Sequence, residues 1–241
     1  MIKYLQLPFH FDAKKMQEET MQLGKDFWKL HFQVKHYDGE WSAIPLRSIR
    51  GEADNGFISP VETDVYEDTV LLQQSPYLQQ VVNWFECPLL SVRLLKLAAG
   101  TQIHEHKDRD LCYEEGLVRF HIPVITNDEV AFYLDKERMH LQEGECWYMN
   151  FNLPHALHNK SKADRIHLVI DARVNEWVKN LFESPAIKNK KEAADMPKHT
   201  KEEQLEMIVH LRNINTETSN HLADQIEESL QNQDSRLMTP D

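Results

Sequence analysis

Cysteine is scarce in this sequence. Cys87, Cys112 and Cys146 are the only three among 241 residues, and no two of them form a Cys-x-x-Cys pair. Secreted domains that depend on disulfides usually carry an even number of cysteines at regular spacings. We therefore expect a reducing compartment, the cytoplasm.

Long apolar runs are also missing. Residues 1–9 contain no stretch that could serve as the apolar region of a secretory signal. No other run approaches the roughly 20 apolar residues that a membrane-spanning helix needs. We expect neither a secretory leader nor a membrane partner.

Positive charge is in short supply. The chain has 27 Lys and Arg against 39 Asp and Glu, a formal net charge of −12 at pH 7. This balance argues against general affinity for nucleic acid or for anionic membranes. Any pocket that binds an anion must therefore be built locally from Arg and His side chains.

Hydrophobic residues make up 41% of the chain, enough for a sizeable core. Short apolar segments with turn signals between them fill its middle, which is typical of an all-β barrel or jelly roll. The predicted strands are 88–98, 102–108, 117–125, 129–134, 138–141, 145–150 and 165–171.

Helices are predicted around these strands. A strand at 2–8 precedes a helix that Asp12 caps and that runs to about Phe32. Its inner face would hold Met16, Thr20, Leu23, Phe27 and Leu30. A strand at 41–48, a loop at 51–64 and a helix from Ser75-Pro76 to about Phe85 follow.

The sequence becomes helical again from Val174. The lysine-rich stretch 186–199 reads as a linker, and Thr200–Glu203 form a capping box for another helix. A last helix would carry Leu222, Ile226 and Leu230. We expect a β domain over residues 1–185 and a helical appendage over 186–241, whose role the sequence leaves open.

A candidate metal site lies at 102–108. In an extended segment His106 and Asp108 point the same way and offer one imidazole and one carboxylate to a single ion. His155 is the best second imidazole, although His104 shares the strand parity of His106 and His158 competes with His155. Two His and one carboxylate on one face of Fe(II), with three open positions, are typical of non-haem oxygenases.

Basic side chains share faces on two further strands. Arg119 and His121 alternate with apolar neighbours, and so do Arg165 and His167. This pattern predicts a polar barrel interior whose apolar outer face is covered by helices. The guanidinium of Arg165 suits the distal carboxylate of a dicarboxylic co-substrate, which it can clamp with two parallel hydrogen bonds.

The order His-x-Asp, Arg-x-His-x-Pro, His, then Arg across residues 88–173 resembles the aspartyl/asparaginyl β-hydroxylase family. The likeness is strongest to its small bacterial branch of free-amino-acid, proline-type hydroxylases, and it is weaker around 41–51. The resemblance implies a double-stranded β-helix, a jelly-roll or cupin-like fold that is mainly β with flanking helices.

The same resemblance implies chemistry. Fe(II) would bind His106, Asp108 and His155, and 2-oxoglutarate would pair with Arg165, aided by His121 and Arg119. With O₂ the protein would hydroxylate a C–H bond of an amino acid or aminoacyl side chain and release succinate and CO₂.

Three other interpretations stay open. They are a non-catalytic cupin-like module that binds a small acid or a metal, a zinc hydrolase, and a β domain whose helical tail recruits a partner. The sequence does not decide whether the substrate is free, carrier-bound or part of a peptide, and it does not give the oligomeric state.

Overall fold

The computed structural model describes residues 1–31, 34–54, 65–108, 110–187, 189–192 and 201–214, with residues 220, 223, 224 and 227. The chain forms two compact units, Met1–Glu192 and Ala193–Asp241. The first unit extends past the expected boundary at residue 185 because strand β14 (Asn189–Glu192) pairs with β1 (Ile2–His10). Part of the stretch expected to be a linker is therefore sheet.

The larger sheet of the first unit is antiparallel at every described pair of strands, in the order β14-β1-β11-β8-β13-β6-β4-β2, with β5 on β4. Its other strands are β11 (Glu145–Met149), β8 (Leu117–Ile125), β13 (Arg165–Arg173), β6 (Leu89–Leu97), β4 (Trp41–Ile49), β2 (Lys29–Leu30) and β5 (Tyr66–Asp68).

The smaller sheet has the order β10-β9-β12-β7-β3. Its strands are β10 (Glu137–Met139), β9 (Val130–Leu134), β12 (His155–Asn159), β7 (Gln102–His106) and β3 (Tyr37–Asp38). Two antiparallel sheets with flanking helices make up a double-stranded β-helix, so the predicted fold class is confirmed. β12, the central strand of this sheet, was not predicted from the sequence.

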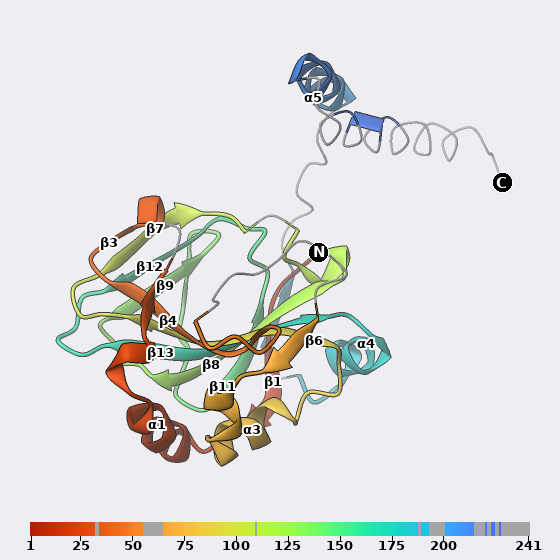
Figure 1. The fold of residues 1–241 in the computed structure, drawn as a ribbon. Coiled ribbons are helices and arrows are strands. Elements are labelled where there is room, and N and C mark those ends of the chain that lie inside the picture. Colours follow the sequence, from red (N-terminus) through yellow and green to blue (C-terminus); the bar gives the residue numbers. More distant parts are fainter. Residues whose placement is uncertain are drawn as a thin grey trace. The chain divides into compact units, whose positions relative to one another are not determined.

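Helices cover the outer face of the larger sheet. Phe120 and Ile122 of β8 and Leu168 and Ile170 of β13 are fully buried in one apolar core on that face. The helices α1 (Ala13–Gln22), α3 (Pro76–Val82) and α4 (Glu176–Glu183) contribute Met16, Leu78 and Val178 to the same core. Figure 1 shows α1 and α3 side by side below the sheet. The prediction of an apolar outer face covered by helices is confirmed.

The first helix begins as predicted and ends early. The Asp12 carboxylate accepts a hydrogen bond from the Lys15 backbone N–H (3.2 Å), and Met16 and Thr20 are buried. The helix stops at Gln22, so its predicted extension to Phe32 is wrong. Leu23 and Gly24 leave the helical conformation, a short 3₁₀ turn (Lys25–Phe27) and β2 follow, and Leu30 is 65% exposed.

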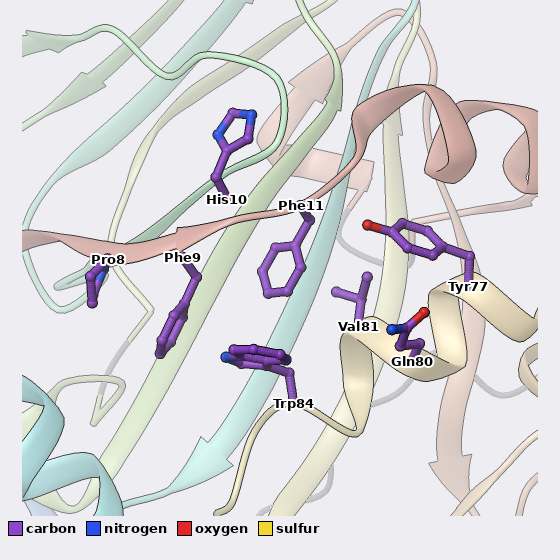
Figure 2. A pocket seen from close by; sticks show the side chains of 8 residues that line it. All are labelled: Pro8, Phe9, His10, Phe11, Tyr77, Gln80, Val81 and Trp84. Atoms are coloured by element: carbon purple, nitrogen blue, oxygen red, sulfur yellow. The ribbon is translucent and has the colours of Figure 1, made fainter.

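An aromatic pocket lies between β1 and α3. Figure 2 shows the rings of Phe9 and Phe11 turned towards Trp84, with Tyr77 and Val81 beyond them. The cavity measures about 330 Å³. No residue of the predicted metal or co-substrate site lines it.

The remaining helices are α2 (Val70–Gln73) in the first unit and α5 (Lys201–Ile214) in the second. Ile208 of α5 packs with Ala223 and Leu211. Thr200, most of the predicted loop at 51–64 and the leucine and isoleucine positions of the predicted last helix lie outside the described residues. None of the helices in the described part of the chain combines the length and apolar composition that crossing a membrane requires.

Candidate metal centre

Three predicted ligands meet inside the double-stranded β-helix. One ligand atom from each of His106, Asp108 and His155 lies within 4.8 Å of the others. His106 ends β7 and faces His155, the first residue of β12, across the antiparallel pair. Asp108 follows β7, and its backbone N–H donates to the Phe151 carbonyl at 2.9 Å. Strand pairing therefore brings together residues that are distant in sequence.

A β-bulge in β7 selects His106 over His104. Leu157 pairs with Ile103 while His155 pairs with His106, so β7 carries one extra residue. The extra residue breaks the two-residue alternation of side chains. Ile103 and His106 consequently both turn inward, whereas His104 is exposed and its Nε2 lies 3.2 Å from Asp38 Oδ2.

His158 does not point towards the candidate metal site. It stands an odd number of residues from His155 along β12, on the other face, where its ring meets Tyr133. Among the described residues, His106, Asp108 and His155 form the one group of three or more His, Cys, Asp and Glu with metal-binding spacing.

Both ligand histidines are oriented by their own chain. His106 Nδ1 donates to the His104 carbonyl at 2.8 Å, and His155 Nδ1 donates to the Leu153 carbonyl at 3.0 Å. This tautomer leaves the Nε2 lone pair of each ring for a metal. Burial lowers the pKa of His155 to about 4, so its imidazole is neutral at physiological pH.

The Asp108 carboxylate is ionised, and one of its two oxygens is hydrogen-bonded to Arg119. Burial alone would raise the pKa of Asp108, but Arg119 and the two histidines lower it overall. Its Oδ2 accepts from Arg119 Nη1 at 2.7 Å, and its Oδ1 lies 3.7 Å from His106 Nε2. Two imidazoles and one anionic oxygen fit a divalent cation such as Fe(II).

Arg119 makes more ion pairs than the sequence suggested. Besides Asp108 it holds Asp171 with Nε at 2.5 Å and Nη2 at 3.1 Å. Arg93 Nη2 donates to the same Asp171 at 3.0 Å. Arg93, Asp171, Arg119 and Asp108 thus belong to one hydrogen-bonded network that ends at a candidate metal ligand.

Arg165 is buried and has no acidic partner within the described part of the chain. Its Nη2 donates to His167 Nδ1 at 2.8 Å, and His121 Nδ1 lies 3.3 Å from that same nitrogen. Arg165 Nε and His121 Nε2 are buried and have no hydrogen-bond partner among the described residues. Burial lowers the pKa of Arg165 to about 9 and those of His121 and His167 well below the usual range.

A cavity of about 430 Å³ reaches Arg165 and His167. Its wall includes the apolar Phe132 and the polar Arg138. The wall also holds the acidic Asp128 and Glu143, but no described carboxylate pairs with Arg165. A buried guanidinium with an unused N–H that lines a cavity is suited to an anion.

Phe151 lies between the candidate metal ligand His155 and the candidate co-substrate residue His121. It was not predicted as a site residue. Its ring stacks on His121 (4.9 Å between centroids, 23° between planes) and meets His155 edge-on (4.7 Å, 87°). The Arg119 guanidinium lies 5.3 Å from the same ring. Phe151 therefore packs against a candidate metal ligand and a candidate co-substrate residue at once.

Further residues near the site also escaped the sequence analysis. His31 stacks on Trp41 at 3.5 Å, and burial, together with Arg93 and Arg119, lowers its pKa to about 3. Asp171 did carry a signal, because it shares the strand parity of Arg165 and His167 on β13.

The family model described as Aspartyl/Asparaginyl beta-hydroxylase matches residues 10–174. The chain belongs to the aspartyl/asparaginyl β-hydroxylase family. The match contains all six predicted site residues: His106, Asp108, Arg119, His121, His155 and Arg165.

One curated relative in this comparison is an L-proline cis-4-hydroxylase of Rhizobium meliloti (strain 1021). The two are 28% identical over 170 residues, which cover 67% of this chain and 60% of the relative. The match thus spans less than two thirds of the relative's length.

Two solved structures align with about three quarters of this chain. A Pseudomonas putida prolyl-4-hydroxylase has a TM-score of 0.45 and 10% identity, with 73% of this chain and 94% of that chain covered. A non-heme monooxygenase in complex with nickel has a TM-score of 0.42 and 12% identity, with 72% and 74% covered.

Proposed function

We propose that the protein is a non-haem Fe(II)- and 2-oxoglutarate-dependent dioxygenase that hydroxylates a C–H bond of an amino acid or aminoacyl side chain. The observation that carries the proposal is the combination of two features in one interior. His106, Asp108 and His155 present metal-binding atoms to a common point. Arg165, on β13 of the facing sheet, is buried and pairs with no carboxylate that the structure describes. Membership of the hydroxylase family supports the same assignment.

In this proposal the two histidines and Asp108 hold Fe(II) on one face. Their Nε2 atoms and Oδ1 are the donors left after His104, Leu153 and Arg119 have engaged the opposite atoms. Bound Fe(II), with 2-oxoglutarate and O₂, supplies the oxidising power that converts C–H to C–OH as succinate and CO₂ are released. The protein's own part is to fix the donors and keep the opposite face open.

Arg165 would bind the distal carboxylate of 2-oxoglutarate. Its free Nε and the neighbouring lone Nε2 of His121 are the two buried polar atoms at this end of the site that lack described partners. Phe151 places an apolar ring between His121 and His155. Because Arg119 already holds two carboxylates, we assign it to the metal side of the site.

We further propose that the substrate is a small amino acid of the proline type and that the protein works in the cytoplasm. The L-proline cis-4-hydroxylase relative supports the substrate class. The three cysteines are free thiols, which fits a reducing compartment.

The test is an anaerobic titration of the metal-free protein with Fe(II) and then 2-oxoglutarate, followed by the visible charge-transfer absorption of the chelate. We expect the band in wild type and in His158→Ala, which alters the outer face of β12. The band should be lost in His155→Ala. Iron binding without the band in wild type would favour the non-catalytic cupin-like binding module, and succinate release with added amino acids would then be absent.

A further inference from the structure

A buried network of four charged side chains ends at the candidate carboxylate ligand. Asp171, Arg93 and Arg119 are 2%, 2% and 8% exposed. Asp171 Oδ1 accepts from Arg119 Nε, and its Oδ2 accepts from Arg119 Nη2 and from Arg93 Nη2. The Arg119 fork is thus clamped on Asp171, which leaves Nη1 for Asp108.

The network decides which oxygen of Asp108 is free. Arg119 Nη1 occupies Oδ2 at 2.7 Å, and Oδ1 is the atom on the side of His106 Nε2. A free aspartate can bind a cation through one oxygen or through both. Two-oxygen binding would take one of the three positions that an oxygenase metal must keep open.

We propose that Asp171 is a positioning residue that acts through Arg119 to restrict Asp108 to one-oxygen coordination. Arg93 shares the charge of Asp171 by donating to Oδ2, the oxygen that also accepts from Arg119 Nη2. The inference rests on the proposed function, since it assigns these residues to the same metal site. It also separates Arg119 from the co-substrate role that the family resemblance implied.

Charge balance supports a positioning role over a purely structural one. The two arginines and two aspartates sum to zero charge before a metal is bound, and among the described residues Arg93 Nε keeps no hydrogen-bond partner. A buried ion-pair network is rarely the most stabilising way to fill a core, because desolvation offsets most of the attraction. The directional fork of Arg119, however, gives geometry that apolar packing does not supply.

The experiment uses Co(II) as the probe, added without oxygen to the metal-free full-length protein. Affinity comes from titration, and coordination number comes from the intensity of the visible absorption. Asp171→Asn keeps the side-chain shape and removes the charge that holds Arg119. We expect at least tenfold weaker Co(II) binding and a changed spectrum, while circular dichroism stays like that of wild type.

Asp68→Asn is the matched control. It breaks the 2.5 Å pair between Arg47 and Asp68, which contacts none of the triad residues. We expect wild-type Co(II) affinity and spectrum. If Asp171→Asn does not fold, Arg119→Lys replaces it, because lysine keeps the charge but cannot bridge both aspartates.

The outcomes separate the two proposals. A folded Asp171→Asn or Arg119→Lys with wild-type Co(II) affinity and spectrum overturns the positioning role and leaves the oxygenase assignment standing. A wild-type protein that binds no Co(II) at the triad overturns the proposed function and the positioning role together.

Discussion

The guanidinium of Arg165 is held by an imidazole and not by an acid: its Nη2 donates to His167 Nδ1 at 2.8 Å. Among the described residues no carboxylate contacts it, and burial accounts for the lowering of its pKa to about 9. Keeping this charge in the interior costs on the order of 5 kcal/mol at neutral pH when no anion is bound. An anionic ligand that pairs with this guanidinium would offset part of that cost.

Replacing Arg165 by methionine should stabilise the ligand-free protein. We expect Tm to stay equal or rise by a few degrees, because an apolar side chain of similar length removes a buried, unbalanced charge. The same variant should lose the rise in Tm that 2-oxoglutarate gives to wild type, with Co(II) affinity retained. Thermal melts with and without 2-oxoglutarate measure both effects.

Arg138→Met is the control for that experiment. Arg138 lines the same cavity but is exposed and donates to the Asp128 carbonyl. It should leave the stabilisation by 2-oxoglutarate nearly unchanged. An Arg165→Met protein that 2-oxoglutarate still stabilises to the wild-type extent would remove Arg165 from the anion site.

Substitutions at His106 and His104, both on β7, should affect metal binding differently. His106→Ala is expected to weaken Co(II) or Fe(II) binding by at least a hundredfold with the fold intact, because one of three protein donors is lost. His104→Ala, two residues away, should bind like wild type, since the bulge turns its side chain to solvent and the carbonyl that orients His106 remains. Anaerobic metal titration measures the difference. Equal loss in both variants would contradict the assignment of the bulge.

The metal-free protein should lose stability in mild acid. Burial lowers the pKa of His31 to about 3 and of His155 to about 4, and those of His121 and His167 lie well below 6.5. Since the unfolded chain takes up protons near pH 6.5, stability is complete above that pH and falls as the pH drops towards 4. His155 alone accounts for roughly 3 kcal/mol.

Melting curves between pH 7.5 and 4.5 test this. His155→Gln should flatten the pH dependence of Tm, and His158→Gln should not. A wild-type Tm that is constant from pH 7 to pH 5 would show that these histidines titrate normally in the folded protein.

Phe151→Leu should affect the co-substrate side more than the metal side. Losing the ring removes the stacking on His121, and we expect roughly 1–3 kcal/mol of lost stability and weaker 2-oxoglutarate binding. Co(II) affinity should change less than threefold, because the backbone carbonyl of Leu153 orients His155. Calorimetric titration of each ligand separates the two. A larger loss for Co(II) than for 2-oxoglutarate would contradict this placement of Phe151.

The sequence predicted the strands with strong period-two patterns and missed short or polar ones. Residues 117–125 were predicted as a strand with the bounds that β8 has, and the strand at 165–171 was confirmed and extends to Arg173. β12 was missed because His155, His158 and Asn159 make it look like a loop, although three of its five residues are buried. The helix over 13–22 was predicted too long because apolar residues at Phe27 and Leu30 continued its spacing after Gly24 had ended it.

For the candidate site, the sequence identified residues but not their contacts. His106, Asp108 and His155 could be selected by residue type and spacing, yet the bulge that removes His104 depends on pairing with a strand far along the chain. Asp171 and Arg93 could not be connected to Asp108, since the network joins three separate strands and a loop. Those links come from tertiary structure alone.

The candidate metal ligands differ in what orients their side chains. Each histidine is aimed by a carbonyl two residues before it, so a short segment carries both the ligand and its support. The carboxylate depends on Arg119, Asp171 and Arg93, which come from three neighbouring strands. A small shift in any of those three strands would therefore disturb the carboxylate, while each histidine keeps the carbonyl that orients it.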